Sequence, residues 1–509
     1  MKNNLEDNLE KKTEKNLEKS LNKKIEKDLD KKLNKKMDKK AEIKIKTKLR
    51  MNYILMALFI FASAALMLFI NYFQKVLNVS RTASGITIFV VISIIFLLYG
   101  LILKKHKEIF KNNKLLFGLI IIVSIVFALI IPTTSRDVYS YIANGWTSVH
   151  YNENPYEVTV NEVEDKYNVD DEMFSKMAPV WKNEPVTYGP IWGLGISGIL
   201  SYLSFGNINV ALALFKISAV LVHLACCILI WKITKKKIWC AIYGLNPFIL
   251  FEALTDVQND LYIALFILLA IYFAVKKKNL FLAVMFVAIG TLIKYVAIFA
   301  LPFIVLYLLK EKSIKQKFIY GFMSLLEFFA IIIGCYLICF GNLEALANPW
   351  IQQSKYNSSI MYVIYTLSNK NMELLSIIEK VILAIFVVSY VAVVFKLIFK
   401  PDKTFSKTMR KYYIFIVLFT LVIMTNFNRW YLLWLFPTIF LIRGKHVKLL
   451  LYFSYAILAS IFFTFYILEI EKMGDLYITL FILLTLILVI IDRTKDNIKL
   501  IRNKSGKNI

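Results

Sequence analysis

Apolar runs of about 20 residues recur along most of this chain, and they constrain its fold more than any other feature. A helix of that length crosses the hydrocarbon core of a bilayer. The runs lack the alternation of polar and apolar residues that a membrane β-barrel requires. Because a backbone in lipid must satisfy its own hydrogen bonds, the sequence predicts an all-α polytopic membrane protein.

Positive charge lies in the short segments between the apolar runs. The basic segments are residues 104–114, 232–237, 276–278, 310–317, 400–411 and 443–448, together with the tail from Asp492. The positive-inside rule predicts that all of them are cytoplasmic. Residues 133–190 carry 10 acidic side chains against 4 basic ones and are expected on the outer side. The formal net charge of +27 is therefore interpreted as membrane topology and not as nucleic-acid binding.

These assignments predict a bundle of about 14 transmembrane helices with both termini in the cytoplasm. The expected crossings are 53–74, 85–103, 115–132, 209–231, 238–254, 261–275, 280–293, 295–309, 317–340, 379–399, 412–426, 430–442, 447–469 and 475–492. The helix 209–231 must by itself carry the chain from the outer side to the basic segment 232–237. The apolar segment 191–205 therefore cannot be a further crossing, and it is expected to lie in the outer interface. Two hairpins are expected to turn at Lys294 and at residues 426–430.

The chain divides into three parts by composition. Residues 1–50 form a Lys-rich, low-complexity tail with 18 Lys and Arg against 10 Asp and Glu, expected to be cytoplasmic. Residues 51–492 form the transmembrane domain, in which 133–208 are the extracytoplasmic loop and interfacial helix that cap the bundle. Residues 493–509 form a second basic cytoplasmic tail.

Unusual polar and aromatic residues gather where the predicted helices reach the outer boundary of the membrane. The candidate site residues are Arg136, Asp137, Tyr139, Tyr188, Pro190, Asn259, Asp260, Lys294, Arg429, Trp430 and Tyr431. Ionisable side chains at membrane depth are costly and indicate function by default. Five segments that are distant in the sequence are thus expected to form one site.

The chemistry of these residues suits group transfer from a phosphate. Asp137 is the candidate general base that accepts a proton from a hydroxyl nucleophile, with Asp260 as a second catalytic candidate. Lys294 and Arg429 can bind a phosphate leaving group. The alternative is that Asp137 forms a structural salt bridge, in which case its partner is expected from another helix because neighbours on a helix do not face one another.

No cofactor is predicted from the sequence. A phosphate-binding loop of the G-x-x-x-x-G-K-[ST] type is missing, which argues against ATP-driven transport. The acidic stretch 161–174 has the composition of a divalent-cation site, but such a run is more often a solvated surface. The prediction is therefore a site without a metal.

Four motifs resemble those of a known family. SRDVYSY (135–141), NPY (154–156), TYGPIW (187–192) and QND (258–260) are similar to the bacterial polyprenol-phosphate-mannose-dependent mannosyltransferases, particularly the actinobacterial alpha-1,6-mannosyltransferases of the GT-C superfamily. The resemblance covers most of residues 115–310. It implies a GT-C helical bundle, Asp137 as the base, and inverting transfer without a nucleotide cofactor. The Lys-rich tail has no counterpart in that family.

The sequence thus predicts an integral membrane glycosyltransferase that moves a sugar, expected to be mannose, from a polyprenyl phosphate to a cell-envelope glycan or glycolipid. Its partners are the lipid-linked donor, the acceptor and the bilayer, and its site is extracytoplasmic in the cell membrane. A transporter or flippase of lipid-linked glycans is the alternative, because it would use the same cations but need no base. A scaffold that recruits acidic partners through the basic tail is a third possibility.

Overall fold

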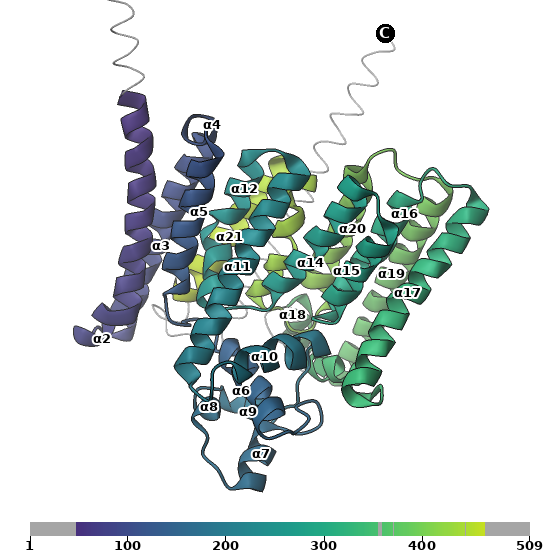
Figure 1. The fold of residues 1–509 in the computed structure, drawn as a ribbon, viewed down its shortest axis with the longest axis horizontal. Helices are drawn as coiled ribbons and strands as arrows, with labels where there is room; N and C mark the ends of the chain where they lie inside the picture. The colour runs from purple at the N-terminus through teal and green to yellow at the C-terminus, as the bar shows by residue number, and fades with distance from the viewer. Residues whose placement is uncertain (1–46, 355–358, 370, 443, 464–509) are drawn as a thin grey trace, which may run out of the picture.

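The described part of the chain is mostly helical (Figure 1). The structure is a computed structural model, and it describes residues 47–354, 359–369, 371–442 and 444–463. Within these ranges 80% of residues are helical and there are no strands. The predicted all-α class is therefore confirmed, whereas the predicted crossing at 475–492 and most of both tails lie outside the described residues.

Five helices in the described ranges are long and apolar enough to cross a membrane. They are Thr47–Val76, α3 (Arg81–Lys104), α11 (Ile208–Thr234), α17 (Ile314–Phe340) and α19 (Met372–Phe399). A sixth span is possible where the segments Lys237–Gly244 and Pro247–Thr255 follow one another with a bend of 48°. The predicted number of about 14 crossings is not confirmed.

Shorter helices fill the bundle between these spans. They are α4 (His106–Ile109), α5 (Asn113–Ala128), α12 (Lys237–Gly244), α13 (Pro247–Leu250), η3 (Phe251–Thr255), α14 (Asp260–Tyr272), η4 (Phe273–Lys277), α15 (Leu280–Thr291), η5 (Tyr295–Ala300), α16 (Leu301–Leu308), α18 (Ile360–Leu367), α20 (Phe405–Leu418), η7 (Phe419–Ile423), η8 (Arg429–Trp434), η9 (Phe436–Leu441) and α21 (Gly444–Ile461). The 12 residues of α15 rise only about 18 Å, too little for the hydrocarbon core. Helices that stop partway leave their ends, and the breaks between them, inside the protein.

Both predicted hairpin turns are present as helix breaks. Lys294 has an extended backbone between α15 and η5, and residues 424–428 separate η7 from η8. Pro302 lies in the first turn of α16, where its missing N–H costs nothing. The chain therefore turns at the two points where the sequence places polar side chains within apolar runs.

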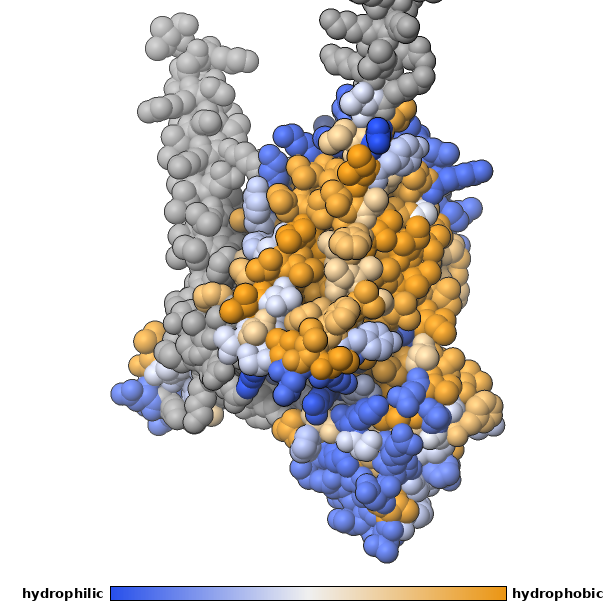
Figure 2. Space-filling model, turned by 90° about the vertical axis from the view of Figure 1, so that its left-hand side faces the viewer, coloured by the Kyte–Doolittle hydropathy of each residue, from blue (hydrophilic) through white to orange (hydrophobic). Residues whose placement is uncertain are grey.

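A helical lobe lies at one end of the bundle (Figure 1). It consists of α6 (Asp137–His150), α7 (Val160–Tyr167), α8 (Glu172–Ser175), α9 (Pro179–Lys182), η2 (Ile191–Ile196) and α10 (Ser197–Tyr202). Figure 2 shows that this lobe is hydrophilic, whereas the side of the bundle above it is apolar. The elements η2 and α10 of the segment 191–205 lie in the lobe, packed on α6, and are too short to count among the candidate spans, whereas the interfacial position expected for this segment stays a prediction.

Contacts at the end of α17 help to fasten the lobe to the bundle. The η6 segment (Glu344–Ser354), which follows α17, contributes Asn348, whose side-chain amide donates to the Tyr156 and Val186 carbonyls at 2.9 Å each. The Tyr156 ring also packs on Phe340, the last residue of α17, with 4.6 Å between centroids. The C-terminal end of α17 therefore marks the lobe end of the bundle, and its N-terminal end marks the opposite end.

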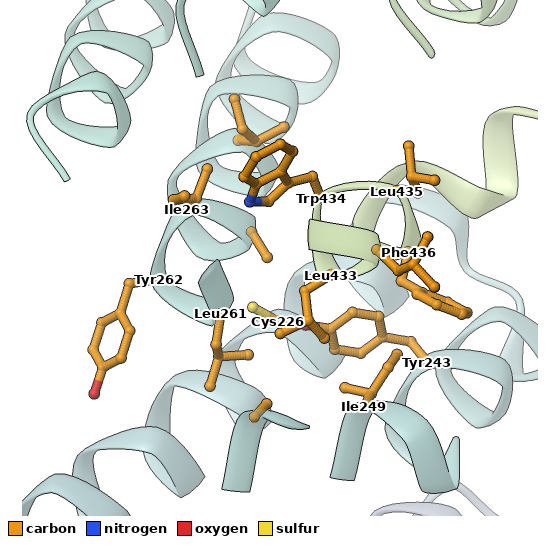
Figure 3. Packing of buried hydrophobic residues seen from close by; sticks show 14 of the residues in the cluster. Cys226, Tyr243, Ile249, Leu261, Tyr262, Ile263, Leu433, Trp434, Leu435 and Phe436 are labelled. Atoms are coloured by element: carbon orange, nitrogen blue, oxygen red, sulfur yellow. The ribbon is translucent and has the colours of Figure 1, made fainter. Parts of the chain in front are cut away.

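The apolar core surrounds the start of α14 and the segment η8–η9. Figure 3 shows Leu261, Leu433 and Phe436 close to Tyr243 and Ile249, which come from α12 and α13. All five side chains are buried. This packing fixes the polar residues that immediately precede α14 against those that begin η8.

Candidate active site

The residues predicted to form a site come largely from the boundary between lobe and bundle. Asp137 begins α6, Asp260 begins α14, and Arg429 begins η8. Lys294 occupies the break after α15, and Tyr188 precedes η2. Each of these positions is a helix end or a break, where side chains are free of the regular helix surface.

Asp260 and Lys294 form a buried salt bridge at this boundary. The Lys294 ammonium donates to Oδ1 of Asp260 at 3.0 Å, and Nε1 of Trp434 donates to the same oxygen at 2.5 Å. The Asp260 side chain is fully buried and that of Lys294 is 10% exposed. Burying these two charges costs desolvation free energy, which the hydrogen bonds from Lys294 and Trp434 to Asp260 must offset.

Three aromatic rings surround the Lys294 ammonium. The distances from Nζ to the ring centroids are 4.5 Å for Tyr431, 5.2 Å for Trp434 and 5.7 Å for Tyr188. Tyr431 and Trp434 are stacked on one another at 4.5 Å. A cation within about 6 Å of aromatic faces is stabilised by their quadrupoles, so the rings hold the ammonium at a fixed place.

Arg429 binds two carboxylates and a hydroxyl. Its Nε donates to Glu252 at 2.6 Å, and its Nη2 lies 3.5 Å from an oxygen of Asp256 and donates to the Thr134 hydroxyl at 2.5 Å. Asp256 also accepts from the Thr133 amide at 2.8 Å and from the Thr134 hydroxyl. The network ties the segment that leads into the lobe to η3 and η8.

Lys216 of α11 supports this network from inside the bundle. Its ammonium donates to the carbonyls of Ile130 at 2.6 Å, Thr255 at 3.0 Å and Leu254 at 3.4 Å. These are carbonyls at the ends of α5 and η3, which have no helical partner of their own. Lys216 thereby joins two helix ends next to Asp256, with which it interacts electrostatically.

Asp137 differs from the other three acids of the site. Glu252, Asp256 and Asp260 are fully buried and each meets a cation, whereas Asp137 is half-buried in the lobe. Burial raises the pKa of the Asp137 carboxyl above its usual value, and the Gln258 and Ser135 side chains lower that pKa in part. The charges of Lys294 and Arg429 also lower it, so both cations lie within electrostatic reach of Asp137.

The Tyr-Gly-Pro element docks the lobe on the break at Lys294. The Gly189 amide donates to the Ile293 carbonyl at 3.0 Å, and the Ile191 amide donates to the Leu292 carbonyl at 3.1 Å. A Cβ on Gly189 would lie 2.1 Å from the Leu292 carbonyl oxygen, so only glycine fits. Pro190 is buried beside it and precedes η2. This contact places Tyr188 against Lys294.

The turn before α14 is strained. Val257 has φ = +56°, a conformation that is a genuine outlier for a β-branched residue, and it is fully buried. It lies between Asp256, which belongs to the Arg429 network, and Gln258, whose side-chain oxygen accepts from Tyr141 at 3.4 Å. Such strain persists where packing enforces it, and it tends to occur at functional sites.

Asn259 is fully buried at the same turn. Neither atom of its side-chain amide has a hydrogen-bond partner among the described residues, and Oδ2 of Asp260 is in the same situation. Buried polar atoms are nearly always paired in folded proteins, so unpaired ones need an explanation. They are the groups that a hydroxyl-rich ligand would satisfy.

Three predicted residues lie at the periphery of this cluster. Arg136 is exposed at the N-cap position of α6, without a side-chain capping bond, and its charge acts on nearby Tyr139. The Tyr139 ring faces the Lys176 ammonium at 5.7 Å. The Trp430 ring lies 5.0 Å from the Arg429 guanidinium carbon and so reaches the cluster only through Arg429.

Sequence reasoning missed several members of the cluster. They are Thr134, Tyr141, Lys216, Glu252, Asp256, Gln258 and Trp434. Glu252 and Lys216 carried a usable signal, because each is a single charge within an apolar run, where charges are rare and indicate function. Trp434 gave no such signal in the sequence, because a single tryptophan in an apolar run is ordinary.

The acidic stretch 161–174 is engaged within the lobe. Glu162 belongs to the capping box of α7, and Glu164 accepts from Lys182 at 2.8 Å. Asp171 accepts from Trp146 at 2.8 Å and from Tyr151 at 2.7 Å. No group of three or more His, Cys, Asp or Glu side chains that could hold a metal ion occurs in the described ranges.

Fold and site together define a helical membrane protein with an ionisable cluster where a hydrophilic lobe meets its bundle. The model of the MptA_B family, described as alpha-(1->6)-mannopyranosyltransferase, N-terminal domain, matches residues 53–310. Because the match covers just over half of the chain, the protein belongs to this mannosyltransferase family. No curated protein matches the chain. Asp137, Asp260 and Lys294 lie within the matched residues, whereas Arg429 lies beyond them.

Proposed function

We propose that this protein transfers mannose from a polyprenyl phosphate to a hydroxyl of a cell-envelope glycan or glycolipid. The family supports the sugar and the reaction class. The proposed site lies on the outer side of the cell membrane, with the N- and C-termini in the cytoplasm. This orientation is supported by the charge distribution, since the lobe sequence is acidic and the segments at the opposite end are basic.

The observation that carries the mechanism is the difference between Asp137 and its neighbours. Asp256 and Asp260 are committed to buried ion pairs, and a carboxylate already bound to a cation is a poor proton acceptor. Asp137 is half-buried and, unlike the other three acids, forms no ion pair among the described residues, so its carboxylate is free to accept a proton. This supports Asp137 as the base and gives Asp260 a positioning role toward Lys294.

The proposed reaction is a single displacement with inversion. Asp137 takes the proton of the acceptor hydroxyl while the hydroxyl oxygen forms a bond to C1 of the sugar. The bond from C1 to the phosphate oxygen breaks on the opposite face, and polyprenyl phosphate leaves. Lys294 and Arg429 stabilise the charge that develops on the phosphate. The reaction written in this way uses no nucleotide and no metal.

The sugar of the donor is proposed to bind at the turn before α14. The unpaired amide of Asn259 and Oδ2 of Asp260 are next to Lys294, so a sugar whose phosphate meets Lys294 can bring hydroxyls to them. The rings of Tyr188 and Tyr431 lie beside the ammonium and Pro190 is buried two residues after Tyr188, while Arg136, Tyr139 and Trp430 lie at the periphery of the cluster.

The test is a donor panel with the purified full chain. Membrane acceptors are supplied with radiolabelled polyprenyl-phosphate mannose, glucose or arabinose, and label in the acceptor is counted. Mannose transfer is the expected result. Binding of the donors without transfer to any acceptor would instead favour the alternative, a flippase of lipid-linked glycans, and movement of donor across vesicle membranes would then be measured.

A further inference from the structure

A groove opens between three helices at the end of the bundle opposite the lobe. It is lined by residues from η5 and α16, from the N-terminal half of α17, and from the C-terminal half of α19. Its volume is about 590 Å³, within the range of roughly 300–1,000 Å³ typical of small-molecule sites. The α17 residues that line the groove lie away from the lobe, because α17 meets the lobe with its other end, while η5 leads from Lys294 to the groove.

The walls of the groove are apolar and partly open to lipid. Phe318, Phe322 and Phe329 are 54%, 61% and 49% exposed along one side, whereas Phe328 is buried as part of the floor. In a membrane this opening faces acyl chains and not water. An apolar chain can therefore enter sideways from the bilayer.

One cation lies in the wall of this groove. The Lys317 side chain is buried, and its ammonium donates to the Ile398 carbonyl near the end of α19 at 2.7 Å. An ammonium has three N–H groups, and this bond is the single hydrogen bond of the Lys317 ammonium among the described residues. A charge held in an apolar wall is costly unless a counter-charge comes with the occupant.

More positive charge surrounds the same end of the groove. Lys310 donates to the Lys403 carbonyl at 3.3 Å, which brings the basic segments 310–317 and 400–411 together. Lys312 and Lys315 are exposed beside Lys317. Clusters of this kind attract anionic head groups, with each lysine near the surface contributing.

We propose that this groove binds an anionic phospholipid, with an acyl chain between α16, α17 and α19 and the phosphate at Lys317. The lipid belongs to the leaflet opposite the lobe. The proposal does not depend on the transfer reaction, because none of the groove residues contacts the Asp137 cluster through a described bond.

Two glycines of α17 provide a matched test. A Cβ on Gly321 or on Gly334 would meet nothing within 4 Å, so a side chain can begin at both positions without a clash. Gly321 lines the groove and Gly334 does not. Gly321→Leu therefore fills the groove, and Gly334→Leu makes the same chemical change on the same helix outside it.

The experiment is native mass spectrometry of the full chain in detergent with phosphatidylglycerol and phosphatidylcholine of identical acyl chains. Wild type and Gly334→Leu are expected to retain phosphatidylglycerol preferentially, and Gly321→Leu to bind it roughly tenfold more weakly. Equal binding by the two glycine variants overturns the proposal. Displacement of the phospholipid by polyprenyl phosphate also overturns it, because the groove would then belong to a prenyl chain.

A second pair of variants tests the head group without filling the groove. Lys317→Met removes the buried charge, and Lys315→Met removes an exposed charge two residues away. The preference for phosphatidylglycerol over phosphatidylcholine should disappear in the first variant and persist in the second. A preference that survives Lys317→Met rejects Lys317 as the phosphate contact.

Discussion

Lys294 and Asp260 meet at 3.0 Å across two breaks in the bundle that are 34 positions apart in the chain. Trp434, from a third segment, donates to the same carboxylate oxygen. One charge pair thus joins the end of α15, the start of α14 and η8. Its stability and its effect on the site are therefore properties of all three segments together.

Removing one partner of this pair should destabilise the protein more than removing both. Asp260→Asn leaves a buried ammonium without a counter-charge, which costs about 3–5 kcal/mol of unfolding free energy for buried pairs. Lys294→Met has the converse effect. Thermal unfolding in detergent should show that the double variant recovers part of the loss. Additive losses in the double variant would show that the two side chains act independently.

Gly189 should not tolerate even one methyl group. In Gly189→Ala the new Cβ would lie 2.1 Å from the Leu292 carbonyl oxygen, so the lobe must separate from the break at Lys294. The expected result is a lower melting temperature and loss of transfer. Gly195→Ala is the control, because its Cβ would meet only the Pro190 carbonyl oxygen at 3.8 Å. Equal behaviour of the two variants would contradict the docking described for the Tyr-Gly-Pro element.

Asp137→Asn should raise the melting temperature while it abolishes transfer. Burial raises the pKa of Asp137 in the folded protein, so folding favours its protonated form. Ionised Asp137 therefore costs stability, and this cost grows as pH rises from the ordinary pKa of aspartate to the raised pKa and is constant above it. Melting temperatures measured from about pH 4 to about pH 8 should show a gain from the substitution at the upper end that shrinks toward the lower end. A gain that does not depend on pH would have another cause.

The same pKa predicts an acid limb in the rate profile of wild type. A base works only when it is deprotonated, so transfer should fall as pH drops through the raised pKa of Asp137. The measurement is kcat/KM for mannose transfer across that range. A rate that stays level down to about pH 4, the ordinary value for aspartate, would contradict a raised pKa at the base.

Lys216→Met should loosen the site from within the bundle. The substitution leaves the Ile130 and Thr255 carbonyls without their donor, at a cost of about 1–3 kcal/mol for each buried group. Lys232→Met removes an exposed lysine from the same helix and should be neutral. Melting temperatures of the two variants provide the comparison. Equal stability of both would show that Lys216 does not hold the two helix ends.

The two turns at the candidate site could be predicted from the sequence, but the contacts among its residues could not. The apolar runs interrupted at Lys294 and at residues 426–430 predicted two turns, and both are present. The pairing of these turns with Glu252, Asp256 and Asp260 depends on tertiary packing between segments up to 177 positions apart, as for Glu252 and Arg429. Periodicity and charge carry no information about such partners.

The number of crossings shows a similar limit. The charge rule requires α15 and the segment Tyr295–Leu308 to lead out and back, and the expected crossing 280–293 is already short for a bilayer; α15 has only 12 residues. A helix that ends at the site inside the protein is not required to span the bilayer. The length of each helix decides whether it can span the bilayer. An apolar run that continues through a turn does not show where each helix ends, so this length cannot be determined from hydropathy.

The central claim is that Asp137 accepts the proton of the acceptor hydroxyl, and single-turnover transfer of radiolabelled mannose from polyprenyl phosphate tests it most directly. Asp137→Asn is compared with wild type and with Asp165→Asn, an exposed aspartate of α7 in the same lobe. We expect Asp137→Asn to bind donor normally but to transfer about 10²-fold or more slowly, while Asp165→Asn behaves as wild type. Transfer by Asp137→Asn at the rate of wild type would contradict the account.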